Sequence, residues 1–148
     1  MVVQALSKLF DRDLSKLRKE ISSYEHEPNI WKIEKNIANS AGNLCLHLVG
    51  NLNTYIGNEL GETNYVRDRV AEFSVKDIPR STLLGMVEDT QRVVRESLAK
   101  VSDEALQIEY PMLVFDQKTT TGYFLIHLAT HLGYHLGQVN YHRRLIDC

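Results

Sequence analysis

The chain has 148 residues, of which 43% are hydrophobic and 24% are charged, and its formal net charge is −2. These values are typical of one globular domain and do not indicate binding to DNA or to an anionic membrane. No apolar run approaches the ~18 residues that span a bilayer, the N-terminus lacks a signal-peptide pattern and the two cysteines form no CxxC motif, so we expect a cytoplasmic protein with one domain over residues 1–148.

Helical periodicity first appears between residues 2 and 22, where apolar side chains recur at intervals of three and four. Pro28 ends this segment, because proline lacks an amide donor and restricts the residue before it. A second helix is expected from about residue 41 to residue 60. Asn39 or Ser40 can cap its first turn, and Gly61 suits its C-terminal end.

Residues 62–80 are expected to form a long charged connection to a third helix, which begins near Ser81 and ends near Val101. Residues 102–120 contain two short extended runs, so a small hairpin or extended segment is expected there, although Pro111 argues against a central strand. The fourth helix is the longest, from about residue 121 to residue 145. Four amphipathic helices with almost no strand signal predict an all-α four-helix bundle in which at least one connection crosses over.

Four of the six histidines lie in this last helix, at positions 127, 131, 135 and 142. Residues four apart on an α-helix lie about 40° apart and about 6 Å along the axis, so two such imidazoles can point at one ion. The pairs His127–His131 and His131–His135 satisfy this geometry equally, and spacing alone does not choose between them. His142 lies roughly 10 Å beyond His135 and should not reach the same ion.

The second helix carries a polar row of Asn43, His47 and Asn51 beside its leucine stripe. Burying such a row without partners would cost ~1–3 kcal/mol per group. An ion shared by His47, His131 and His135 would satisfy it, with Asn51 or Gln138 nearby. Three neutral imidazoles leave at least one coordination position open, as in catalytic sites. The alternative is that the histidines are half-buried side chains with ordinary hydrogen-bond partners.

Other motifs give weaker signals. HExxH, ExxH, GxGxxG and GxSxG patterns are absent. Charged residues cluster at Arg67, Asp68, Arg69 and Glu72. We interpret them first as a solvated surface with weak local ion pairs, and second as arginines at a cleft mouth that bind an acidic substrate. Cys45 lies 200° around the helix from His47 and should be a small core residue.

The segments "NSAGNLCLHLVGNLNTYIG", "RDRVAEF" and "HLATHLGYHLGQVNY" together resemble the DinB-like superfamily, closest to its branch of small uncharacterised bacterial proteins and related to YfiT-type proteins. This resemblance implies a four-helix bundle, often homodimeric, that holds a divalent metal through three histidines. Carried onto this chain, the ligands are His47, His131 and His135, and His127 is structural or supports a ligand. Tyr134 is a departure, because many relatives have a histidine there.

Superfamily members with known activity include metal-dependent transferases of low-molecular-weight thiols. The resemblance thus implies an enzyme in which Zn or Ni activates a thiol or water to act on a small molecule, with Gln138, Asn51 and Tyr134 orienting the reactants. No general base stands out. The alternative is a non-catalytic metal-binding helical dimer that acts as a stress-related interaction module.

Overall fold

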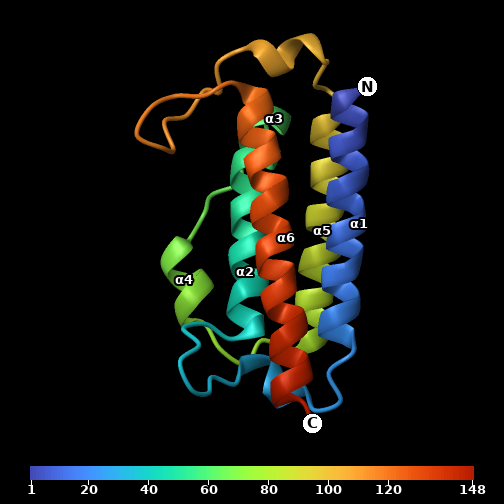
Figure 1. Cartoon of the computed structure of the whole chain (residues 1–148), viewed down its shortest axis with the longest axis vertical. Helices are drawn as coiled ribbons and strands as arrows, with labels where there is room; N and C mark the ends of the chain where they lie inside the picture. The colour runs from blue at the N-terminus through green and yellow to red at the C-terminus, as the bar shows by residue number, and fades with distance from the viewer.

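The computed structural model describes all 148 residues as an all-α bundle, as expected (Figure 1). Its four long rods run roughly parallel or antiparallel to one axis. Their bounds are α1 (Val2–Ser22), α2 (Ala41–Leu52) with its continuation, α5 (Arg80–Leu98) and α6 (Thr121–Ile146). None of the helices combines the length and the hydrophobicity needed to cross a membrane.

A single cluster of 29 buried hydrophobic residues fills the space between the rods. On α1 the buried positions recur at threes and fours, as the periodicity predicts. Phe10, Leu17 and Ile21 on this helix are fully buried. The fold therefore has an ordinary apolar core, and His47 and His142 are buried among its polar neighbours.

The second rod is longer than α2 itself, because a π-helical turn (Asn53–Asn58) and the short α3 (Glu59–Gly61) continue it to the expected end. Ser40 caps α2 by accepting a hydrogen bond from the Asn43 amide. All twelve residues of α2 are buried. The cause is the position of α2 in the molecule: one side faces the bundle, and α4 (Arg69–Ser74) covers the outer side (Figure 1).

The structure corrects two expectations about the connections. Residues 62–80 are not only a charged loop, because α4 lies within them and is capped by Asp68, which accepts from the Ala71 amide. Residues 102–120 form no hairpin. They hold a 3-10 helix (Glu104–Gln107), like the one that follows α1 (Glu27–Trp31), and one isolated bridge between Glu109 and Thr120.

Candidate metal centre

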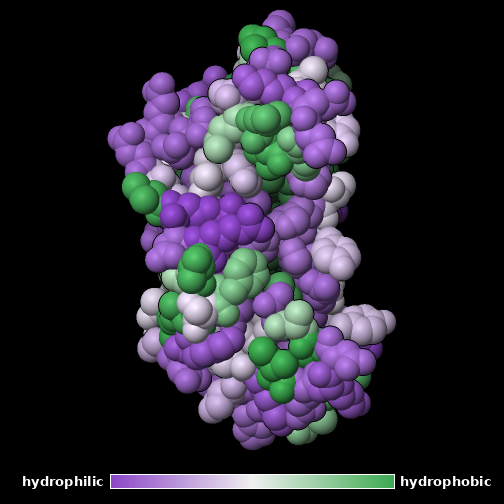
Figure 2. Space-filling view, turned by 90° about the vertical axis from the view of Figure 1, so that its left-hand side faces the viewer, coloured by the Kyte–Doolittle hydropathy of each residue, from purple (hydrophilic) through white to green (hydrophobic).

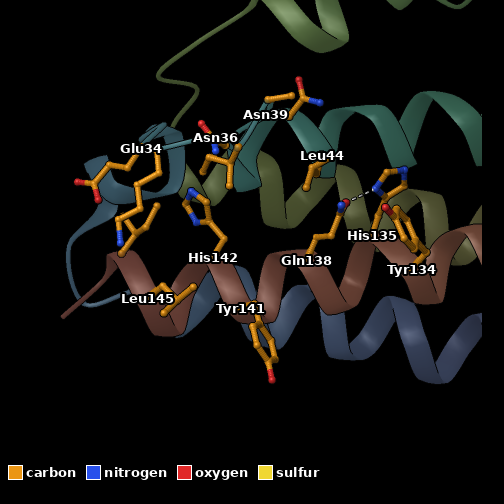
Figure 3. A pocket seen from close by; sticks show the side chains of 14 residues that line it. Glu34, Asn36, Asn39, Leu44, Tyr134, His135, Gln138, Tyr141, His142 and Leu145 are labelled. Carbon is orange, nitrogen blue, oxygen red and sulfur yellow. Dashed lines mark hydrogen bonds between the residues drawn. The ribbon is translucent and has the colours of Figure 1, made fainter.

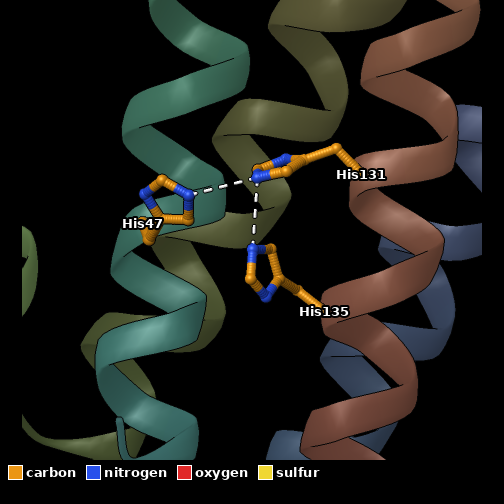
Figure 4. A group of neighbouring side chains, drawn as sticks. All are labelled: His47, His131 and His135. Atoms are coloured by element: carbon orange, nitrogen blue, oxygen red, sulfur yellow. Dashed lines mark hydrogen bonds between the residues drawn. The ribbon is translucent and has the colours of Figure 1, made fainter. Parts of the chain in front are cut away.

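Three imidazoles from two helices converge between α2 and α6 (Figure 4). His47 comes from α2, whereas His131 and His135 lie one turn apart on α6. The Nε2 atom of His131 lies 3.2 Å from Nε2 of His47 and 3.1 Å from Nε2 of His135. All three ligand atoms lie within 4.8 Å of one another. The structure therefore brings His131 and His135, the second of the two pairs that spacing allowed, together with the ring of His47.

The tautomers of two rings follow from their outer contacts. Nδ1 of His47 lies 3.0 Å from Oε1 of Glu72, and a carboxylate can only accept, so this Nδ1 carries the hydrogen. Nδ1 of His135 lies 2.7 Å from Oε1 of Gln138 and donates in the same way. The Nε2 atoms of both rings are then left with lone pairs that point toward His131. This is the arrangement by which outer partners orient metal-ligating histidines.

The cluster fits a bound cation better than it fits hydrogen bonds alone. One hydrogen on Nε2 of His131 can satisfy only one of its two close neighbours, so at least one Nε2 lone pair would be left without a hydrogen. Nitrogen ligands at 2.0–2.1 Å from a tetrahedral zinc ion are roughly 3.3–3.4 Å apart, close to the two observed separations. The cluster could therefore hold a metal ion. The Nδ1 atom of His131 is buried without a partner, so no contact within the chain sets its tautomer.

Burial keeps the α6 ligands in the neutral form that binds metals. Burial, with a smaller contribution from neighbouring cationic groups, lowers the pKa of His131 to about 4. Burial also lowers the pKa of His135, although the hydrogen bond with Gln138 partly opposes this. Both rings are therefore unprotonated at neutral pH.

Glu72 is the residue of the candidate site that sequence reasoning missed. Its side chain is only 6% exposed, and its carboxylate accepts from His47 and from Nε and Nη2 of Arg67 at 2.8 and 3.0 Å. Burial opposes ionisation, but the hydrogen bonds from His47 and Arg67 outweigh it and hold the pKa of Glu72 below its usual value. The interpretation of this charge cluster as a solvated surface is therefore wrong for Glu72 and Arg67. Asp68 and Arg69 are exposed, and Arg69 lines a cavity described below.

The two asparagines in the polar row of α2 lie in different environments. Asn43 is satisfied within the chain, because its amide donates to the carbonyls of Glu72 and Val75. An ion is not needed to satisfy Asn43, contrary to the expectation for the whole row. Asn51 differs, since its Oδ1 atom is buried and has no partner.

The other candidate residues take separate positions. Tyr134 is 65% exposed, and its ring centroid lies 5.2 Å from that of His135. His127 stays outside the triad and packs edge-on against Phe115 at 4.8 Å between centroids. His142 bonds to Tyr24 and to the Lys32 carbonyl instead. Cys45 is fully buried, as expected, and burial raises the pKa of its thiol to about 12.

Two cavities lie along α6 on opposite sides of the triad. The first, of about 510 Å³, is called the His135 cavity and is lined by His135, Gln138, Leu44 and residues further toward the C-terminus of α6 (Figure 3). The second, of about 250 Å³, is called the His131 cavity. It is lined by His47 and Asn51 of α2, by His127 and His131 of α6, and by six further residues. Small molecules could therefore reach the three rings from two directions.

Comparison with curated proteins finds no match. The sequence profile of one family, described as "Protein of unknown function (DUF1572)", matches residues 1–147. This match spans nearly the whole chain, including both histidine-bearing helices, and agrees with the resemblance seen in the motifs. The chain therefore belongs to the DUF1572 family, which lies within the DinB-like superfamily.

Proposed function

We propose that this protein is a metal-dependent enzyme in which His47, His131 and His135 bind one divalent ion, zinc or nickel, for chemistry on a small molecule. The observation that carries the proposal is the convergence of three Nε2 atoms whose neighbouring contacts, through Glu72 and Gln138, point two lone pairs at a common centre. Imidazole nitrogen suits both metals. The resemblance to YfiT- and DinB-type metalloenzymes supports the same ligand set.

The reaction we propose is the activation of a thiol or a water for transfer to, or hydrolysis of, a small molecule. A bound divalent ion would lower the pKa of such a nucleophile, so that its reactive anion forms near neutral pH. Glu72 holds the His47 ring, and Gln138 holds the His135 ring, so both are positioning residues. Tyr134 and Asn51 lie where they would contact reactants in the two cavities.

Metal analysis of the purified protein tests this proposal. We expect about one zinc or nickel per chain, and loss of that metal in His47→Ala, His131→Ala and His135→Ala. His26→Ala is the matched control, because His26 is exposed and far from the triad in sequence and structure. Metal-loaded protein should consume a low-molecular-weight thiol in the presence of a model electrophile, or hydrolyse an activated ester or amide. A metal-free protein whose three variants behave like His26→Ala would contradict the proposal.

The second candidate function is a non-catalytic metal-binding dimer that acts as an interaction module. One observation favours it: Glu72, the only carboxylate hydrogen-bonded to any of the three histidines, is occupied by His47 and Arg67 and is not free to act as a general base. Under this alternative, removing the metal lowers the melting temperature, and no thiol or ester is consumed. We also propose a cytoplasmic homodimer, and sedimentation velocity would test the dimer directly.

A further inference from the structure

The His131 cavity has a cationic character that the proposed chemistry does not explain. Arg67 and Arg69 approach it from the segment at the start of α4, and none of its ten lining residues is acidic. The face that carries α4 shows a strongly hydrophilic band across its middle, between hydrophobic patches (Figure 2). A cavity with this lining attracts anions.

The two arginines are not equivalent. Arg67 is engaged, because its Nε and Nη2 atoms both donate to Glu72. Arg69 takes part in none of the ion pairs of the chain and in none of its side-chain hydrogen bonds. Its guanidinium thus keeps all five donors available for an anionic group.

A second observation in the same cavity points to a ligand. Asn51 is only 7% exposed, lines the cavity and has an Oδ1 atom without a hydrogen-bond partner. Buried side-chain oxygens are normally paired, so this acceptor calls for a donor from a bound molecule. The lining therefore holds one cation and one buried acceptor that both lack a partner within the chain, beside a wall formed by Val114, Phe124 and Leu128.

We infer that the His131 cavity binds a small organic acid that carries a hydroxyl or amide donor in addition to its carboxylate. Arg69 pairs with the carboxylate, and Asn51 Oδ1 accepts from the donor. A carboxylate is favoured over a phosphate group because only one guanidinium is available and the remaining wall is apolar. This inference rests on the proposed function, because it takes the bound acid to be a reactant of the proposed enzyme. The acid would lie next to His131.

The test uses four probes on the full chain: lactate, propionate, 1,2-propanediol and inorganic phosphate. Binding is followed by NMR titration of backbone amides and arginine Nε–H signals, in metal-loaded protein and in chelator-treated protein. The chelator-treated sample excludes direct binding of the acid to a metal. The variants are Arg69→Gln and Asn51→Ala, with Arg92→Gln as the control for loss of an exposed arginine on α5.

We expect lactate to bind more tightly than propionate or propanediol, with or without metal. Arg69→Gln should weaken lactate binding by about tenfold or more, as expected for loss of a charge-assisted hydrogen bond. Asn51→Ala should remove the advantage of lactate over propionate and leave propionate binding unchanged. Arg92→Gln should bind all four probes as the unmodified protein does. Since Arg69 has no partner and Asn51 Oδ1 accepts no bond, both variants should keep the melting temperature.

Several outcomes would overturn the inference: no binding of either acid, equal lactate affinity in Arg69→Gln, or tighter binding of phosphate than of lactate. Failure of the proposed function gives a different pattern. If the protein holds no metal but lactate binding still depends on Arg69, the metal proposal fails and the acid-binding cavity stands. If the three histidines hold metal but lactate affinity is unchanged in Arg69→Gln, only the cavity inference fails.

Discussion

The carboxylate of Glu72 links the candidate metal centre to Arg67. It fixes the hydrogen on Nδ1 of His47 and neutralises Arg67 in a largely buried position. Such outer partners of metal ligands commonly change metal affinity by about 10–100-fold. We therefore expect this side chain to affect metal affinity without being a ligand.

We expect Glu72→Gln to weaken metal binding by about 10–100-fold, since the neutral amide holds His47 less strongly and no longer compensates Arg67. The same variant should lose about 3 kcal/mol of unfolding free energy, because Arg67 is left half-buried and unpaired. Competition with a chromophoric chelator measures the affinity, and urea unfolding of the metal-free protein measures the stability. The matched control is Glu88→Gln, which breaks an exposed pair with Arg18 and should change both quantities little.

His142 gives the bundle a pH dependence that is separate from the metal centre. Tyr24 donates to its Nδ1 atom at 2.6 Å, and its Nε2–H donates to the Lys32 carbonyl at 2.8 Å. Both contacts suit the neutral ring, and burial lowers the pKa of His142 below the ordinary 6.5. Between the pKa of folded His142 and about pH 6.5, the unfolded chain binds more protons than the folded chain. The contribution of His142 to stability is therefore retained above about pH 6.5 and is lost as the pH falls toward the folded pKa.

The prediction is that His142→Gln is less sensitive to acid between about pH 6.5 and pH 5. The difference in slope should not exceed about 1.4 kcal/mol per pH unit, the limit for one proton. His131 and His135 titrate in the same direction but are present in both proteins, so the difference isolates His142. Urea unfolding of chelator-treated protein at several pH values measures it, and equal slopes would show that the His142 contacts carry no such linkage.

At the scale of single residues, the sequence predicted the three histidines because their spacing is local or matched by a resemblance. The contact of Glu72 with His47 was not predicted, because no periodicity relates residue 72 to residue 47, which lies 25 positions earlier. Charged residues in a connection are usually solvated, and Arg67 and Glu72 are buried only because α4 folds onto α2. The polar row showed the same limit, since the partners of Asn43 are carbonyls of that connection.

Among the elements, α2 and α4 meet at Gly50, where a larger residue would displace the Glu72 carboxylate. A Cβ atom on Gly50 would lie 1.9 Å from Oε2 of Glu72. That carboxylate is held by Arg67 and His47 and cannot move without loosening one of them. Gly50 lies one turn after His47 on α2. The close approach of α4 and the orientation of the His47 ring therefore both depend on the absence of a side chain at Gly50.

We expect Gly50→Ala to weaken metal binding by about tenfold or more, although it changes no ligand, because the displaced Glu72 no longer orients His47. Alanine favours helices over glycine by about 0.5–1 kcal/mol, but here the clash should cancel that gain. Gly85→Ala is the matched control, since a Cβ atom on Gly85 meets nothing within 4 Å. It should stabilise α5 without changing metal affinity. Chelator competition and thermal unfolding separate the two effects.

The long helices were predictable because each has an apolar stripe of three- and four-residue period, and the second rod ended at Gly61 as expected. Six residues of α4 are too few for a periodicity signal within a charged segment. The two extended runs near Pro111 do not pair as strands. Instead, Tyr110 is buried, stacks on Phe124 at 4.3 Å between centroids and donates its hydroxyl hydrogen to the Tyr55 carbonyl. Tertiary packing, and not local propensity, therefore determines the conformation of this segment.

At the scale of the whole molecule, the candidate metal centre lies between two helices, α2 and α6, that the apolar core already holds together. The 29 residues of that core include none of the three histidines. Metal-free protein should therefore remain helical and folded, unlike small zinc domains that unfold when the metal is removed. The centre nevertheless bridges α2 and α6, so a bound ion should add to the stability of the folded state alone.

The prediction is a metal-dependent gain in unfolding free energy of about 2.7 kcal/mol when the free zinc concentration is 100 times the dissociation constant. Urea unfolding with and without zinc measures the gain, and far-UV circular dichroism follows helix content. His131→Ala should show no gain, whereas His26→Ala should show the full gain. Loss of helix on chelation alone would contradict a core that folds without the ion. An equal zinc effect in His131→Ala would place the metal somewhere other than between α2 and α6.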